Sequence, residues 1–343
     1  MDLLPTEEQQ QIIDTAANFL AHEFPVKNLI KRTDNTTPFT RSHLQHIASM
    51  GWIGIGLPED YDGVGCGLAE EALLFVELGR NLMSPSVLAS VLAAHVAAQS
   101  GTTAYLRPIL EGEVKIALAS ARPALPLHIG ASIDGEFLLY DAEDADLVLV
   151  ADQGGAALLL LSSLECMQTE KCIDSTLHLS RRVATATPAL CFVPVEKENI
   201  FLRGALLISA MLLGIAEATL ERSVNYARER EQFGKPIGSF QAIKHYCAEM
   251  AIRCESVRAM LYHASITLQA QSSAGPFDTF SLKALAIDAA QSNANTAVQI
   301  HGGMGYTQEM DIHLFVKRAQ VLGTLFGSER FHLKKLLAER APD

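Results

Sequence analysis

The first third of the chain carries apolar residues at helical spacing. A helix that starts behind Thr6 gathers its apolar residues on one face: Ile12, Ile13, Ala16, Phe19 and Leu20. Similar patterns recur over residues 41–50, 68–81, 85–99 and 102–111, and Gly or Pro turns separate them. The pattern therefore predicts an N-terminal helical domain over residues 1–112.

The pattern changes to short β-type runs between residues 114 and 194. Five runs rich in Leu, Val, Ile and Ala have Gly, Asp or Pro between them: KIALASA, EFLLYDA, DLVLVAD, AALLLLS and ALCFVPV. Residues 161–182 show neither period and stay unassigned. We therefore expect a small central β-sandwich or barrel domain over residues 113–200.

Long helical periods return after residue 200. They cover residues 204–231, 240–271, 277–301, 311–317 and 328–340. Two of these helices carry an apolar stripe: Leu206, Leu213, Ala216, Leu220 and Val224 on the first, and Ile243, Cys247, Met250, Cys254 and Val257 on the second. Stripes of this kind favour an antiparallel helical bundle over residues 201–343. The whole chain is then an α+β multidomain protein.

Composition and charge limit the partners. The 343 residues are 49% hydrophobic and 19% charged, as in globular proteins, and the formal charge of −12 argues against a nucleic-acid partner. The six cysteines form no CxxC pair, and no Cys/His cluster has metal-ligand spacing, so we predict no metal. The N-terminus lacks the pattern of a signal peptide. The most apolar stretch, residues 205–215, is too short to span a bilayer, so we expect a cytoplasmic protein.

Two glycine-containing segments in the last third are candidates for chemistry. The first, YAREREQFGKPIGSFQ over residues 226–241, is a helix end with crowded charges and a Gly/Pro turn. The second, VQIHGGMGYT over residues 298–307, is an apolar helix that ends on Gly302, Gly303 and Gly305. Each segment alone is typical of an ordinary helix end followed by a turn.

Together, the two segments resemble the C-terminal domain of the acyl-CoA dehydrogenase family. The glycine-rich MGWIGIGLPEDYDGVGCG at residues 50–67 is similar to a signature of that family's N-terminal domain, although a structural link between helices is an alternative interpretation. The order helical domain, β domain, helical bundle matches the family from end to end. The resemblance implies FAD as cofactor, bound by seven residues: Arg230, Gln232, Phe233, Gln241, Gln299, Gly302 and Gly303. A core aromatic is the alternative for Phe233, and a helix-end salt bridge with Glu229 or Glu231 is the alternative for Arg230.

The reaction that the resemblance implies is α,β-dehydrogenation of an acyl-CoA thioester, in which a carboxylate removes the α-proton. In relatives this base is a Glu at one of two places, which correspond here to Phe326 and Gly204. Both usual bases are missing. The β-domain loop that contacts flavin in relatives is also altered around Ala121. The nearest acid, Glu329, is a candidate relocated base, with helix capping as the alternative.

These departures suggest the base-less subunit of a bacterial α/β hetero-oligomeric dehydrogenase, which completes the FAD site of a partner. The alternatives are a homo-oligomeric dehydrogenase with a relocated base, a structural homologue without flavin, and a flavin monooxygenase or nitroalkane-oxidising relative. A role in lipid metabolism and electron-transfer flavoprotein as electron acceptor are also implied by the resemblance. The acyl chain, the oligomer size and activity of the chain alone stay open.

Overall fold

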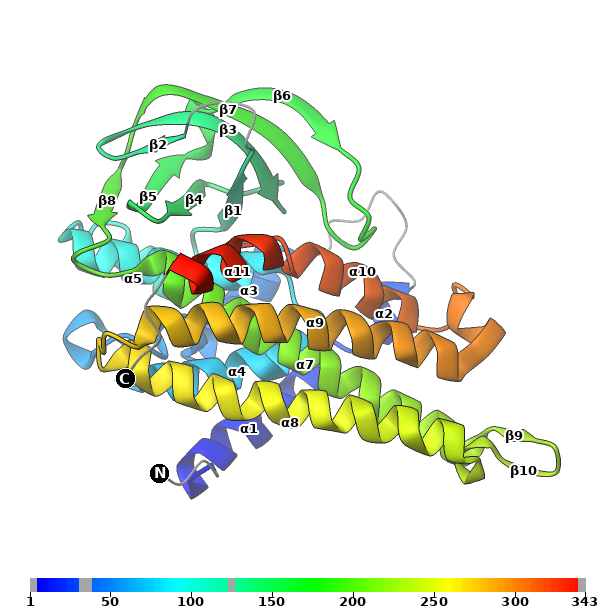
Figure 1. Ribbon diagram of the computed structural model, residues 1–343. Coiled ribbons are helices and arrows are strands. Elements are labelled where there is room, and N and C mark those ends of the chain that lie inside the picture. Colours follow the sequence, from blue (N-terminus) through cyan, green and yellow to red (C-terminus); the bar gives the residue numbers. More distant parts are fainter. Residues whose placement is uncertain (1–4, 31–38, 123–126, 339–343) are drawn as a thin grey trace. The chain divides into compact units, whose positions relative to one another are not determined.

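The protein is described from a computed structural model, which covers residues 5–30, 39–122 and 127–338. The chain divides into two compact units (Figure 1). The helical unit comprises residues 1–31, 68–83 and 205–343, and the sheet unit comprises residues 32–67 and 84–204. The N-terminal helix and residues 68–83 thus pack with the C-terminal helices. Domain boundaries at residues 112 and 200 stay a prediction.

Long helices dominate the helical unit. In chain order its described helices are α1 (Glu7–Glu23), α2 (Lys27–Ile30), α4 (Leu68–Arg80), α7 (Ile200–Glu229, whose first residues belong to the sheet unit), α8 (Gln241–Gln269), α9 (Gly275–His301), α10 (Ile312–Leu322) and α11 (Glu329–Ala338). Helices α8 and α9 lie side by side along much of their length (Figure 1), and both contact α7: Asn293 Nδ2 of α9 donates to the carbonyl oxygen of Ala216, and Arg258 Nη2 of α8 contacts Glu217 over 2.6 Å. The predicted helical bundle is confirmed.

Two glycines bring α4 and α7 into backbone contact. A Cβ atom at Gly79 would lie 2.1 Å from the carbonyl oxygen of Met211, and one at Gly214 would lie 2.0 Å from that of Val76. No side chain fits at these distances. The two helices can therefore cross closely only with glycine at both positions.

The sheet unit combines short helices with one mixed sheet. Its described helices are α3 (Arg41–Ser49), α5 (Pro85–Ser100) and α6 (Leu106–Leu110), with 3₁₀ turns η1 (Trp52–Gly54), η2 (Glu59–Tyr61) and η3 (Leu161–Ser163). The strands are β1 (Ile116–Ala121), β2 (His128–Ile129), β3 (Ser132–Tyr140), β4 (Leu147–Asp152), β5 (Gly155–Leu160), β6 (Glu165–Glu170), β7 (Leu179–Pro188) and β8 (Cys191–Pro194). The predicted β domain is confirmed.

The sheet has the order β6-β7-β3-β1-β4-β5-β8, with β2 paired to β3. The β1–β4 pair is parallel, and the other pairs are antiparallel. Side chains of Phe137, Leu139, Val148 and Leu159 form its buried core. Strands β6 and β7 occupy much of the stretch that the sequence left unassigned.

Backbone hydrogen bonds hold the glycine-rich segment 50–67 in place. The amide of Val64 donates to the carbonyl oxygen of Gly54, and that of Gly65 donates to Leu57. A Cβ atom at Gly63 would lie 2.1 Å from the carbonyl oxygen of Leu57. The glycines of residues 50–67 therefore allow a compact connection between α3 and α4, as the structural interpretation of this segment predicts.

Helix α7 is long and apolar enough to cross a membrane by length and composition. Its most apolar 18-residue window has a mean hydropathy of 1.8, but 83% of that window is buried inside the protein. The sequence-based judgement that this stretch is too short considered only residues 205–215. Burial, rather than length, identifies α7 as a core helix.

Candidate functional site

The first motif forms a two-residue β-hairpin between α7 and α8. Strands β9 (Glu231–Gln232) and β10 (Lys235–Pro236) pair through Gln232 and Lys235, and a 3₁₀ turn, η4 (Ile237–Ser239), follows. Phe233 and Gly234 have φ angles of 54° and 77°, as in a type I′ turn. Glycine accepts this conformation readily, whereas phenylalanine rarely does. The turn points the Phe233 ring outward.

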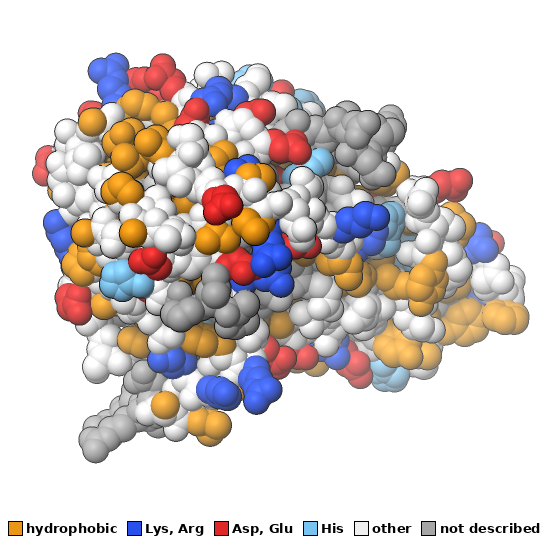
Figure 2. All heavy atoms as spheres, turned by 90° about the horizontal axis from the view of Figure 1, so that it is seen from above, with side chains coloured by type: hydrophobic (Ala, Val, Ile, Leu, Met, Phe, Trp, Pro, Cys, Tyr) orange, Lys and Arg blue, Asp and Glu red, His pale blue; other side chains and the backbone are white. Residues whose placement is uncertain are grey.

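Phe233 is 92% exposed, so the alternative of a core aromatic is wrong. Its ring meets Phe240 edge-on, with the centroids 6.0 Å apart. In the space-filling view, hydrophobic side chains gather at the end of the molecule where the hairpin lies, on the right (Figure 2). An aromatic ring held this far from the core is available to a ligand or another chain.

The second motif caps α9. Gly302 ends the helix with φ 60°, and the 3₁₀ turn η5 (Gly302–Tyr306) follows. A Cβ atom at Gly302 or Gly303 would meet no atom within 4 Å, whereas one at Gly305 would lie 3.0 Å from the carbonyl oxygen of Val298. Gly303 has no positive φ and no close neighbour, so nothing within the described chain requires glycine there. The open surface fits the close approach of a phosphate group.

The two motifs lie at the same end of the helical unit (Figure 1), and side chains of one apolar cluster join them. Ile237 and Ile243 from the first motif and its helix pack with Val298 and Ile300 from the second. The Tyr226 ring stacks on the His301 ring, with centroids 4.2 Å apart and the planes 23° apart. The structure therefore brings together segments that lie about sixty residues apart in the sequence.

The polar residues proposed for FAD all lie on the surface of this region. Arg230, Gln232, Gln241 and Gln299 are exposed. Among the described residues, the Arg230 guanidinium forms no ion pair, so the helix-end salt bridge with Glu229 or Glu231 is not observed. A free guanidinium with a forked donor set suits a diphosphate. The residues present thus fit the group that the resemblance implies.

Neither expected position of the base holds an acid. Phe326 lies in a turn after α10, with φ 52°, and Gly204 is buried within α7. Glu329 is exposed in the first turn of α11, and the amide of Phe331 donates to Ser328 Oγ over 3.4 Å. This geometry is that of helix capping. Ala121 ends β1, and residues 123–126 of the altered β-domain loop lie outside the described residues.

A buried polar pair lies beneath the Phe326 turn and was not predicted. His332 Nε2 donates to the carbonyl oxygen of Phe326 over 2.9 Å, and Lys283 Nζ donates to that of Leu322 over 2.9 Å. Both side chains are fully buried. Burial, followed by the nearby Lys283, lowers the pKa of His332 to about 4, and burial lowers that of Lys283. The feature of the sequence that could have revealed this pair is Lys283, a charged residue within an otherwise apolar part of α9.

Comparison with known proteins identifies the family. The model for the acyl-CoA dehydrogenase N-terminal domain matches residues 6–113, and that for the C-terminal domain matches residues 195–341. An acyl-CoA dehydrogenase IpdE2 from Mycolicibacterium smegmatis is 32% identical over 290 residues, which cover 84% of this chain and 85% of the relative. A second IpdE2, from Mycobacterium tuberculosis, is 29% identical, and the match covers 98% of both chains.

Solved structures share the fold. Butyryl-CoA dehydrogenase from Megasphaera elsdenii has a TM-score of 0.84 at 23% identity, over 98% of this chain and 99% of the other. The ChsE4–ChsE5 complex from Mycobacterium tuberculosis also has a TM-score of 0.84, at 24% identity and full coverage of both chains. PigA with FAD and proline has a TM-score of 0.83 at 18% identity, over 98% of each chain. The chain belongs to the acyl-CoA dehydrogenase family, whose members are FAD-dependent oxidoreductases acting on CH–CH groups.

Proposed function

We propose that this chain is the base-less subunit of a two-chain acyl-CoA dehydrogenase and completes the FAD site of its partner. The observation that carries the proposal is a contrast between two sites. The surface that we propose for FAD is open: Arg230 is exposed, and no atom lies within 4 Å of a Cβ position at Gly303. The two positions at which relatives carry a catalytic Glu hold Phe326 and Gly204. The chain has kept the means to bind the cofactor and lost its own base.

Each residue of the FAD surface has a task in this proposal. Arg230 and the amide side chains of Gln232 and Gln299 donate hydrogen bonds to phosphate oxygens, and the backbone of Gly302–Gly303 approaches them closely. Phe233 and Gln241 line the cofactor. When bound, FAD supplies the hydride acceptor of the reaction. The α-proton has to be taken by a carboxylate of the partner, because Phe326 cannot accept a proton.

A partner chain is supported by a similar structure that is itself a complex. The ChsE4–ChsE5 structure contains two different chains. Another similar structure is that of an electron-transferring flavoprotein of Acidaminococcus fermentans, at 25% identity and a TM-score of 0.83. We propose an acyl-CoA thioester as substrate, electron-transfer flavoprotein as acceptor and a cytoplasmic location. The acyl group is not specified by the residues of this chain.

The visible absorbance spectrum of the purified chain tests the proposal. Expressed alone, the chain should carry little FAD and turn over no acyl-CoA. Co-purified with a Glu-bearing family member from the same genome, it should carry FAD, identified after denaturation, and support turnover. Strong dehydrogenation by the isolated chain would contradict the missing base. Loss of that activity in Glu329→Gln with FAD retained would then identify Glu329 as a relocated base.

A further inference from the structure

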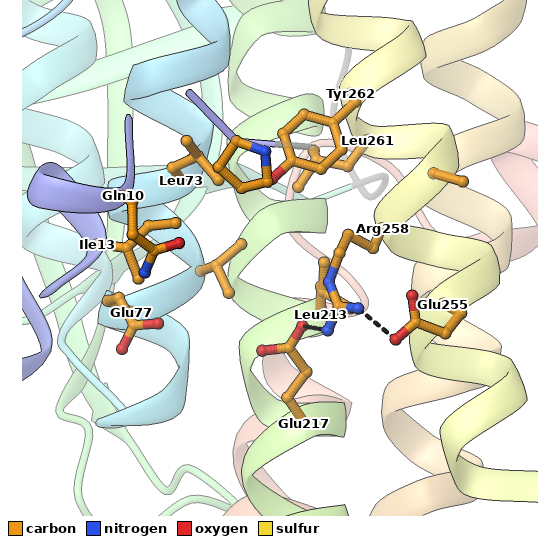
Figure 3. Close-up of a pocket in the computed structure, with 13 residues that line it drawn as sticks. Gln10, Ile13, Leu73, Glu77, Leu213, Glu217, Glu255, Arg258, Leu261 and Tyr262 are labelled. Atoms are coloured by element: carbon orange, nitrogen blue, oxygen red, sulfur yellow. Dashed lines mark hydrogen bonds and ion pairs between the residues drawn. The ribbon is translucent and has the colours of Figure 1, made fainter. Parts of the chain in front are cut away.

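A second cavity lies in the helical unit, apart from the residues assigned to FAD. We call it the four-helix cleft, because its walls come from α1, α4, α7 and α8 (Figure 3). Its volume is about 510 Å³, which is within the range of small-molecule sites. None of the seven FAD residues, Phe326 or Gly204 lines it. The site in the proposed function therefore leaves this cleft without a role.

Most of the cleft wall is apolar. Side chains from all four helices contribute to it: Ile13, Leu73, Val76, Leu213, Leu261 and Ala259. Such a wall favours the hydrocarbon part of a ligand, since its burial removes apolar surface from water. The tail of the ligand is thus expected to be a short alkyl or similar apolar group.

Acidic side chains outnumber basic ones in the lining of the cleft. Glu77, Glu217 and Glu255 line it together with a single guanidinium, that of Arg258. Arg258 is occupied, because its Nη2 contacts Glu217 over 2.6 Å and its Nη1 binds Glu255. The other oxygen of Glu217 accepts from Arg80 Nη1 over 3.0 Å. The guanidinium is therefore not available to an anionic ligand.

Glu77 is the least compensated of these acids. It is 7% exposed, and its Oε2 lies 3.6 Å from Arg80 Nε, which is beyond hydrogen-bond distance. In Figure 3, Glu77 lies on one side of the cleft, and Arg258 and Glu255 lie on the other. A buried carboxylate beside an apolar wall is a counter-ion site for a cation that can donate hydrogen bonds.

We propose that the four-helix cleft binds a small organic ammonium ion, with its ammonium group on Glu77 and its apolar chain along the Leu73–Leu213 side. An ammonium group offers three hydrogen-bond donors and the charge that the cleft lacks. The proposal is independent of the FAD site, since the two share no residue.

The charge of Glu77 gives the site a recognisable pH dependence. Burial raises the pKa of Glu77 to about 7, and Arg80 opposes this rise, while Glu217 and Glu221 of α7 and Asp14 of α1 add to it. An alkylammonium keeps its charge until about pH 10, as lysine does. Affinity should therefore increase by up to about tenfold from about pH 6 to about pH 8, as Glu77 becomes ionised.

Titration calorimetry of the purified full-length chain with n-hexylamine tests this site, with 1-hexanol as the uncharged probe. We expect hexylamine to bind more tightly than hexanol, and more so at the higher pH. Glu77→Gln should weaken hexylamine binding by about tenfold or more, remove its pH dependence and leave hexanol unchanged. Glu221→Gln is the matched control, because Glu221 also contacts Arg80, over 2.5 Å, but does not line the cleft.

The proposal would be overturned by equal binding of hexylamine and hexanol, by tighter binding of hexanoate than of hexylamine, or by unchanged hexylamine affinity in Glu77→Gln. Leu213→Trp fills the cleft from another wall and should abolish binding of both probes. If Glu77→Gln does not fold, the proposal is tested by the wild type alone: by the order of its affinities for hexylamine, hexanol and hexanoate, and by the pH dependence of hexylamine binding. Hexylamine binding that survives in Leu213→Trp would place the amine elsewhere.

Discussion

Two buried ionisable residues in the helical unit, Glu77 and His332, make its stability depend on pH in opposite directions. The pKa of Glu77 is raised to about 7, and that of His332 is lowered to about 4. The folded chain keeps the Glu77 proton where the unfolded chain has released it. It resists protonation of His332 where the unfolded chain accepts it. Between about pH 4.5 and about pH 6.5 the two effects nearly cancel.

Glu77→Gln is expected to flatten the alkaline side of this profile. The contribution of Glu77 to the free energy of unfolding falls by about 3 kcal/mol as pH rises from about 4.5 through 7. Between about pH 6 and about pH 8 the wild type should lose about 1 kcal/mol more than the variant. Urea unfolding of both proteins at the two pH values measures this difference. An identical loss in both proteins would show that Glu77 does not titrate in this range.

His332→Gln is expected to act on the acidic side. Since the folded pKa of about 4 lies below the unfolded value, the contribution of His332 to the free energy of unfolding falls by about 2 kcal/mol as pH falls from about 7 to about 5. Gln can still donate to the Phe326 carbonyl but does not titrate. Thermal unfolding should therefore show that the Tm of the wild type falls relative to that of the variant as pH decreases over this range, because Glu77 acts equally in both proteins. A decrease equal to that of the wild type would contradict a buried neutral histidine.

At the scale of the secondary-structure elements, Gly303 lies in open space, whereas Gly214 lies against the backbone of a neighbouring helix. Gly303→Val should leave Tm unchanged, because no atom lies within 4 Å of its Cβ position, yet reduce FAD occupancy of the assembled enzyme. Gly214→Ala is the opposite case, since its Cβ would lie 2.0 Å from the Val76 carbonyl oxygen, and should cost about 3 kcal/mol or more. Calorimetry and the FAD absorbance of each variant measure both effects. Full FAD occupancy in Gly303→Val would remove Gly303 from the site.

The sequence predicts the long helices well, because each has to bury an apolar stripe. The expected ranges 240–271 and 277–301 correspond to α8 (Gln241–Gln269) and α9 (Gly275–His301). Strand β6 was missed because five of its six residues are exposed, so its sequence has no apolar alternation. The proposed FAD surface rests on a family resemblance and stays a prediction, since each motif alone is an ordinary helix end. The four-helix cleft could not be predicted, because Glu77, Glu217 and Arg258 come to line one cavity only in the folded chain.

At the scale of the whole molecule, we propose that the partner supplies the catalytic base that this chain lacks. A carboxylate introduced at position 326 should then add dehydrogenase activity. Phe326→Glu places a carboxylate where relatives carry their base, in a turn whose carbonyl oxygen is already held by His332. In an FAD-loaded assembly whose partner lacks its own catalytic Glu, this variant should restore measurable dehydrogenation of the partner's acyl-CoA substrate. The matched control is Phe326→Gln, which has the same shape without a base. Equal activity of the two variants would show that position 326 does not face the substrate.

Two exposed aromatic side chains, Phe233 of the hairpin and Tyr306 of η5, should make the chain prone to aggregation when it is alone. Phe233 is 92% exposed and Tyr306 is 79% exposed, which is unusual for large aromatic side chains at a protein surface. If the chain is one subunit of the proposed two-chain enzyme, a newly synthesised copy that has not yet met its partner exposes these apolar side chains to other proteins. We therefore expect that simultaneous synthesis of the two proposed subunits protects this chain from aggregation and proteolysis. An excess of this chain alone should be degraded.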